Sequence, residues 1–339
     1  CRAAATAGGL SALRGHSAGK VGRAVGCPPA CGKRRLQPAL FGNHARVPTE
    51  AMSFADLDRC GVSRRRLRTM LLHQSWVAVR RAAYVEAGRP SIRMLLSAAE
   101  VSLGGGWVAS HATAAHLHGL ALLRRPRPDR LVLTLPSAAK GHADLYGIHF
   151  HRAALHPDHV DVFEGVPLTT VARTLVDLAR ALPLRDGLVA MDAALHAGQV
   201  TQEQLMAVVS ECRRWPWVRR AARAVALSDP AAESPLESVS RLFFIDHDIP
   251  MPTSQVTLTR RGLFLARSDF WWEAQRVAGE ADGLAKYTDA AVLRAEKLRQ
   301  ERIESAGIRV ARWTWYDVDR LQESRRTAAR LRRILGLSA

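Results

Sequence analysis

The chain has 339 residues, enough for two or three domains, and its hydrophobic content of 47% is typical of a globular protein. No segment approaches the roughly 20 consecutive apolar residues of a membrane-spanning helix, so we expect no membrane partner. A total of 49 Lys and Arg residues against 31 Asp and Glu residues gives a formal net charge of +18, which indicates a polyanionic partner, most simply nucleic acid.

Cysteine usage points to a reducing compartment. The chain has five cysteines, an odd number, and they are widely spread along the sequence. This distribution argues against a disulfide framework and predicts a cytoplasmic protein.

The first 45 residues differ in composition from the rest of the chain. They are rich in Ala, Gly and Arg, contain no Asp or Glu, and show neither a helical nor a strand period. We expect residues 1–45 to be a disordered basic leader, or to precede a true start near Met52.

Residues 46–90 carry the pattern of a winged helix-turn-helix domain. A short helix is expected over 54–61. Ser63 is placed to cap a second helix, which has Leu67 on its apolar face, and a β-hairpin follows that helix. A basic helix fits the DNA major groove and a basic wing fits the adjacent backbone. The alternative is a basic amphipathic helix packed on a hairpin with no ligand. We assign as DNA-binding residues Arg64, Arg65, Arg66, Arg68, Arg80 and Arg81.

Residues 91–228 form a middle region that we predict to be α/β. The expected helices cover 92–103, 109–123, 171–182, 184–197 and 201–212, and the expected strands cover 130–135 and 147–152. The region also contains seven histidines: His111, His116, His118, His149, His151, His156 and His159. Their spacings do not repeat a metal-ligand pair on one helix face, so we interpret them as packing or surface residues.

Residues 229–339 predict a third unit with a mixed central sheet. Ser234 is a natural cap for a helix that begins with Pro235, and Glu237 stands at the third position of a capping box. Strands are expected over 254–258, 264–270, 276–281 and 308–313, with helices over 290–305 and from about Tyr316. The order α-β-β-β-α-β-α completes a chain of the α+β class.

An acidic cluster lies inside the apolar strands of this unit. Asp269 and Glu280 meet at one sheet end if the strands are antiparallel neighbours, and Asp282 follows closely. Converging carboxylates repel one another, and Mg²⁺ or Mn²⁺ would relieve the repulsion and activate a water molecule. Glu237 could complete the metal ligands, and Lys286 could orient the attacking water. The alternative is an ordinary hairpin in which Asp269 caps a turn and Glu280 is solvated.

These segments resemble a nuclease family. Residues 267–271 and 279–283, followed by Lys286 and Tyr287, are similar to the very-short-patch-repair-endonuclease-like domain of the PD-(D/E)XK superfamily, and the resemblance covers roughly 229–325. The superfamily cuts DNA with Mg²⁺. The resemblance implies three metal-binding residues, Asp269, Glu280 and Glu237. Asp282 stands where the superfamily has its catalytic lysine, and we infer that Lys286 could substitute for that lysine from a neighbouring position.

The upstream segments resemble an antitoxin family. Residues 61–63 and 76–84, with Leu67 between them, look like the winged helix of AbiEi-family antitoxins from type IV toxin–antitoxin systems, although Ala82 replaces the usual wing glycine. Residues 110–119 and 168–179 resemble the segment that follows it. The resemblance implies a transcription regulator or a DNA-targeting module, with a possible toxin partner.

Two main functions therefore remain open. The first is a Mg²⁺-dependent DNA endonuclease guided by the winged helix, which the retained acidic residues favour. The second is an antitoxin-like DNA-binding regulator whose nuclease fold is catalytically inactive, which Asp282 favours. An RNA-binding protein is a third interpretation, because a basic surface does not distinguish nucleic acids. The sequence favours the endonuclease.

Overall fold

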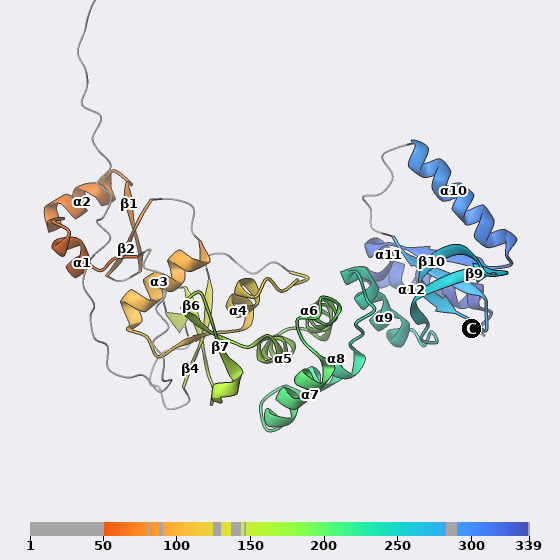
Figure 1. Ribbon diagram of the computed structural model, residues 1–339, viewed down its shortest axis with the longest axis horizontal. Helices are drawn as coiled ribbons and strands as arrows, with labels where there is room; N and C mark the ends of the chain where they lie inside the picture. The colour runs from red at the N-terminus through yellow and green to blue at the C-terminus, as the bar shows by residue number, and fades with distance from the viewer. Residues whose placement is uncertain are drawn as a thin grey trace, which may run out of the picture. The chain divides into compact units, whose positions relative to one another are not determined.

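The structure is a computed structural model that describes residues 51–80, 82–87, 91–124, 130–136, 144–145, 147–282 and 290–337 (Figure 1). Within these residues helices are combined with an antiparallel two-stranded sheet and with mixed sheets of six and four strands, which confirms the α+β class. Each sheet lies inside one of the predicted units 46–90, 91–228 and 229–339, although independent folding of these units stays a prediction. The predicted leader, 1–45, lies outside the described residues. None of the described helices is long and apolar enough to cross a membrane.

The first unit forms its elements in the predicted winged-helix order. They are α1 (Phe54–Arg59), α2 (Arg64–Leu72) and the antiparallel pair β1 (Trp76–Arg80) and β2 (Ala83–Glu86). Ser63 caps α2, since its Oγ accepts the backbone N–H of Arg66 at 3.3 Å, and Leu67 is buried. Ala82 in the hairpin turn has a φ of 59°, the left-handed region that favours glycine. The alanine therefore places strain in the hairpin turn.

The middle unit contains the six-stranded sheet, in the order β5-β6-β4-β3-β8-β7. Its elements are α3 (Ile92–Leu103), β3 (Val108–Ala109), α4 (His111–Leu117), β4 (Leu131–Leu135), β5 (Asp144–Leu145), β6 (Ile148–Arg152), a 3₁₀ turn (Pro157–His159), β7 (Val160–Phe163) and β8 (Val166–Thr169). The helix predicted over 109–123 is wrong at both ends. Ala109 pairs with Leu133 of β4 and with Leu168 of β8, so long-range strand pairing outweighs local helix propensity there.

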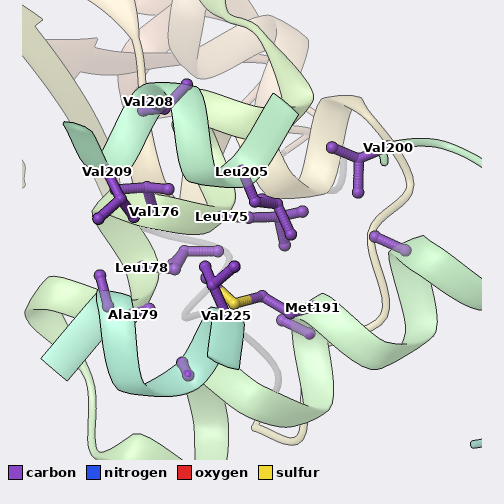
Figure 2. Close-up of a cluster of buried hydrophobic side chains, with 14 of the residues drawn as sticks. Leu175, Val176, Leu178, Ala179, Met191, Val200, Leu205, Val208, Val209 and Val225 are labelled. Carbon is purple, nitrogen blue, oxygen red and sulfur yellow. The ribbon is translucent and has the colours of Figure 1, made fainter. Parts of the chain in front are cut away.

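Four helices complete the middle unit and pack around an apolar cluster (Figure 2). They are α5 (Val171–Ala181), α6 (Leu184–His196), α7 (Gln202–Glu211) and α8 (Val218–Leu227). Leu175, Met191, Leu205 and Val225 supply one buried side chain from each helix. The first three helices match the predicted segments closely, whereas the sequence pattern does not predict α8.

The third unit has the predicted mixed sheet, in the order β12-β11-β10-β9. Its elements are α9 (Pro235–Asp246), β9 (Thr253–Arg260), β10 (Leu263–Trp272), β11 (Val277–Ala281), α10 (Ala290–Ser305), β12 (Arg309–Trp313), α11 (Trp315–Asp319) and α12 (Leu321–Leu335). β11 pairs in parallel with β12, and the other pairs are antiparallel. Phe244 of α9 packs edge-to-face on Phe270 and Trp313, with ring centroids 5.1 and 5.6 Å apart.

Candidate functional site

The predicted carboxylates meet in one cavity of the third unit, which we call the acidic cavity. Phe270 pairs with Gly279 at the end of the antiparallel ladder, and Asp269 and Glu280 are the next residues of the two strands. The cavity has a volume of about 640 Å³. Its charged lining residues are Glu233, Glu237, Arg267, Asp269, Glu280, Asp282 and Arg299. The structure therefore brings together the four described residues of the predicted catalytic set, while Lys286 lies outside the described residues.

Glu237 reaches the acidic cavity because of its place in the first turn of α9. The Ser234 Oγ accepts the backbone N–H of Glu237 at 3.2 Å and donates to its Oε1 at 2.7 Å. Its Oε2 accepts the backbone N–H of Glu233 at 3.0 Å and the Nε2 of Gln255 at 2.8 Å. The side chain is 5% exposed, so these bonds satisfy a buried carboxylate while they cap the helix.

Two arginines balance Glu280. Its Oε1 accepts a hydrogen bond from Arg299 of α10 at 2.7 Å, and its Oε2 lies 2.9 Å from the Nη2 of Arg312 of β12. A second guanidinium nitrogen of Arg312 lies 3.9 Å from Asp282. The protein itself therefore supplies the positive charge that converging carboxylates require.

Asp269 is a partly buried carboxyl group in the acidic cavity. Burial raises its pKa to about 6, and the charges of Glu237 and Glu280 act in the same direction. The backbone N–H of Ala281 donates to its Oδ2 at 2.8 Å and opposes that shift. Gln255 lies 3.4 Å from its other oxygen. Asp269 consequently changes its protonation state close to neutral pH.

The carboxylate oxygens of the acidic cavity are not arranged as ligands for a divalent metal ion in this structure. Magnesium prefers near-octahedral coordination by oxygen atoms, whereas Glu237, Asp269 and Glu280 already accept hydrogen bonds from protein donors. Beside these carboxylates, the buried Oε1 of Gln255 has no hydrogen-bond partner among the described residues. Among the described residues, no group of three or more His, Cys, Asp or Glu side chains is arranged to hold a metal ion. The Mg²⁺ or Mn²⁺ site stays a prediction.

The predicted DNA-binding arginines cluster at the start of α2. Arg65, Arg66 and Arg68 are exposed, and the Arg64 guanidinium lies 5.0 Å from the centroid of the Phe54 ring. The first turn of α2 contains no acidic residue, so the positive end of the helix dipole repels these arginines and no carboxylate offsets the repulsion. An anion bound at this end of the helix would reduce the repulsion. Of the two wing arginines, Arg80 belongs to β1 with its side chain undescribed, and Arg81 lies outside the described residues.

A second cavity, of about 650 Å³, lies in the middle unit and escaped the sequence predictions. His111 and His151, for which the sequence predicts a packing or surface role, stack within it with ring centroids 3.8 Å apart. Arg173 and Asp177 from α5 also line it. The sequence does contain one sign of this cavity. Arg173 and Asp177 stand four residues apart on one helix face, inside an otherwise apolar segment.

Comparison with known proteins relates part of this chain to an antitoxin family. Residues 107–226 match the AbiEi antitoxin C-terminal domain. This match confirms the resemblance noted for segments 110–119 and 168–179, which lie inside it. The winged helix at 46–90 and the nuclease-like unit at 229–339 lie outside the matched residues, so their family resemblances stay predictions.

Two similar proteins come from Mycobacterium tuberculosis: the uncharacterized protein MT2308 of strain CDC 1551 and the uncharacterized protein Rv2248 of strain H37Rv. Each is 28% identical over 249 residues, which cover 74% of this chain and 89% of the relative. The crystal structure of the Rv2827c protein from Mycobacterium tuberculosis covers 62% of this chain and 82% of its own, with 17% identity and a TM-score of 0.41. A likeness this weak carries no argument about the fold.

Proposed function

We propose that this protein is a DNA-binding, antitoxin-like transcription regulator, with a toxin as its second partner, and that its nuclease-like unit is a catalytically inactive scaffold. The match of residues 107–226 to the AbiEi antitoxin C-terminal domain carries this proposal. The arginines of α2, in the helix order of a winged helix, support the DNA-binding part. The formal net charge of +18 supports a polyanionic partner in general.

The contacts in the acidic cavity support the inactive scaffold. A nuclease of the resembled kind needs carboxylate oxygens available to a metal ion, and the two oxygens of Glu280 are instead engaged by Arg299 and Arg312. Asp282 stands where the superfamily has a lysine. These ion pairs join β11 to α10 and β12, which gives the carboxylate a structural role in this unit.

The DNA-binding part is tested by the salt dependence of binding. Each arginine that neutralises a phosphate releases counterions, so removing one such arginine makes the slope of log K against log salt shallower by about 0.9. We expect the triple variant R65A/R66A/R68A to bind a duplex from upstream of its own gene more weakly than the wild type. Its salt slope should be shallower by about 1 to 3. Fluorescence anisotropy at several salt concentrations measures both quantities.

A triple variant on another exposed segment provides the matched control. R213A/R219A/R223A removes the same charge from exposed positions near and on α8. If DNA binds through α2, this control keeps the wild-type salt slope. Equal weakening in the two triple variants would mean that the binding is diffuse electrostatic attraction, and the winged helix would lose its assigned role.

The inactive scaffold is tested separately, by incubation of the purified protein with supercoiled DNA and either Mg²⁺ or EDTA. We expect no Mg²⁺-dependent nicking. Nicking that Asp269→Ala abolishes, with DNA binding retained, would overturn the scaffold proposal and support the endonuclease predicted from the sequence. Nicking that survives the substitution would point to a contaminating nuclease.

A further inference from the structure

The second cavity, in the middle unit, has a strongly cationic lining. We call it the arginine cavity. Five arginines line it: Arg152, Arg173, Arg180, Arg214 and Arg220. Asp177 is its one carboxylate among the described residues. Its volume of about 650 Å³ lies within the range of about 300–1,000 Å³ that is usual for small-molecule sites.

The arginines at the back of the cavity are held rigidly. Arg173 is 1% exposed, and its Nε donates to Asp177 at 2.8 Å, while its Nη1 lies 3.2 Å from His159. Arg180 donates to the other oxygen of Asp177 at 2.8 Å and to the carbonyl of Pro216 at 2.9 Å. One carboxylate therefore orients two guanidinium groups, which leaves an excess positive charge that is already ordered before any ligand arrives.

The two histidines of the cavity add neutral polar groups. Burial lowers the pKa of His111 to about 3 and also lowers the pKa of His151, so both rings are uncharged at neutral pH. The Ser110 hydroxyl accepts a hydrogen bond from Thr134 at 2.8 Å and lies 3.0 Å from the Nδ1 of His111, which holds that ring in place.

Tryptophans supply the apolar part of the lining. The Trp215 ring lies 4.4 Å from the Arg173 guanidinium and 4.9 Å from that of Arg180. Trp217 is 70% exposed, which is unusual for so large an apolar side chain in a folded protein. The Arg220 guanidinium lies over the Trp217 ring, 5.3 Å from its centroid. The rest of the exposed indole offers a stacking surface for a base next to donors for phosphate.

Backbone strain is an independent sign of function in the arginine cavity. His111 and Trp217 both have positive φ values, of 49° and 62°. For the bulky Trp217 this conformation is an outlier that costs free energy, whereas histidine tolerates it better, and such outliers cluster at functional sites. Two of them line the same cavity from separate segments of the chain, at the start of α4 and immediately before α8.

From these observations we infer that the arginine cavity binds a mononucleotide, with its phosphates on the arginines and its base on Trp217. This site is distinct from the α2 arginines proposed to bind DNA and goes beyond the function proposed above. A small nucleotide ligand would give the regulator an input other than DNA.

Isothermal titration calorimetry on the full chain tests the inference with ATP, GTP, CTP and UTP, and with adenosine and inorganic tripolyphosphate as partial ligands. We expect at least one of the four nucleotides to bind with one site per chain, and adenosine not to bind. Arg214→Ala should weaken binding about 10- to 100-fold, because it removes a charge-assisted hydrogen bond. Trp217→Ala should weaken it about 5- to 100-fold, because it removes the stacking surface.

Two controls keep the result specific. Arg214 and Trp217 are exposed, so their variants should fold, which circular dichroism checks. Arg213→Ala changes the neighbouring exposed arginine, which does not line the cavity, and should bind nucleotide as the wild type does. The α2 triple variant should also keep full nucleotide binding, so failure at one site is distinguishable from failure at the other.

Three outcomes would overturn the inference. The first is that none of the four nucleotides binds at millimolar concentration. The second is that tripolyphosphate binds as tightly as every nucleotide and Trp217→Ala has no effect, which would leave only a nonspecific anion site. The third is that Arg213→Ala weakens binding as much as Arg214→Ala.

Discussion

Asp269→Asn should stabilise the protein at neutral pH and lose this advantage in acid. The pKa of Asp269 rises from 3.8 to about 6 on folding, through burial first and then through Glu237 and Glu280. In the unfolded chain this carboxyl ionises at lower pH than in the folded protein. Its contribution to stability is therefore fully present below about pH 4 and is lost as the pH rises through about 6. An asparagine keeps an acceptor for the Ala281 N–H and carries no charge.

The size of the effect follows from the shift in pKa. A shift of about 2 pKa units at 1.36 kcal/mol per unit sets an upper limit of about 3 kcal/mol. Asp269 is partly exposed, so solvent screens its interaction with the neighbouring charges. We therefore expect a gain in stability of about 1–2 kcal/mol. The stability of the variant relative to the wild type should therefore rise by that amount between pH 4 and pH 7.

Urea denaturation in EDTA, monitored by tryptophan fluorescence from pH 4 to pH 8, measures this difference. Asp246→Asn, an exposed exchange of the same kind at the end of α9, is the control and should change stability by less than about 0.5 kcal/mol. A difference for Asp269→Asn that stays constant from pH 4 to pH 7, or that falls, would refute the reasoning. Repeating the series with millimolar Mg²⁺ would reveal a metal site as stabilisation of the wild type alone.

Two further predictions concern packing and buried charge. Gly279→Ala should lower stability by about 1–3 kcal/mol. The new Cβ would lie 2.7 Å from the Cη2 of Trp313 and 2.8 Å from the Cζ3 of Trp272, which is too close for carbon atoms. A melting temperature equal to that of the wild type would contradict this prediction. Arg173→Met should cost about 3–5 kcal/mol by leaving Asp177 short of a partner, and adding Asp177→Leu should recover part of that stability, as a double-mutant cycle in urea would show.

Local sequence patterns predicted the parts of this structure that depend on near neighbours. Ser63 and Ser234 cap the helices that follow them, because a cap bonds to a backbone N–H only three residues away. The strands of the third unit appear where alternation and turn residues placed them, and the mixed sheet follows from their order. The convergence of Asp269 and Glu280 was also predictable, since one hairpin carries both.

Contacts between distant segments were beyond those patterns. Nothing in the sequence near Glu280 indicates that Arg299 and Arg312 form ion pairs with it, because both arginines come from segments further along the chain. The split of the predicted helix at Ala109 likewise depends on pairing with β8, far along the chain.

The sequence by itself determined the basic character of this protein, its α+β class and most of its helices and strands. The tertiary structure alone decided which charged groups face one another, and so revealed the arginine cavity, whose walls combine His111, His151, Arg173 and Trp217. The physical reason is that backbone conformation responds to neighbours within a few residues, whereas electrostatic partnership depends on distances that only the folded chain sets.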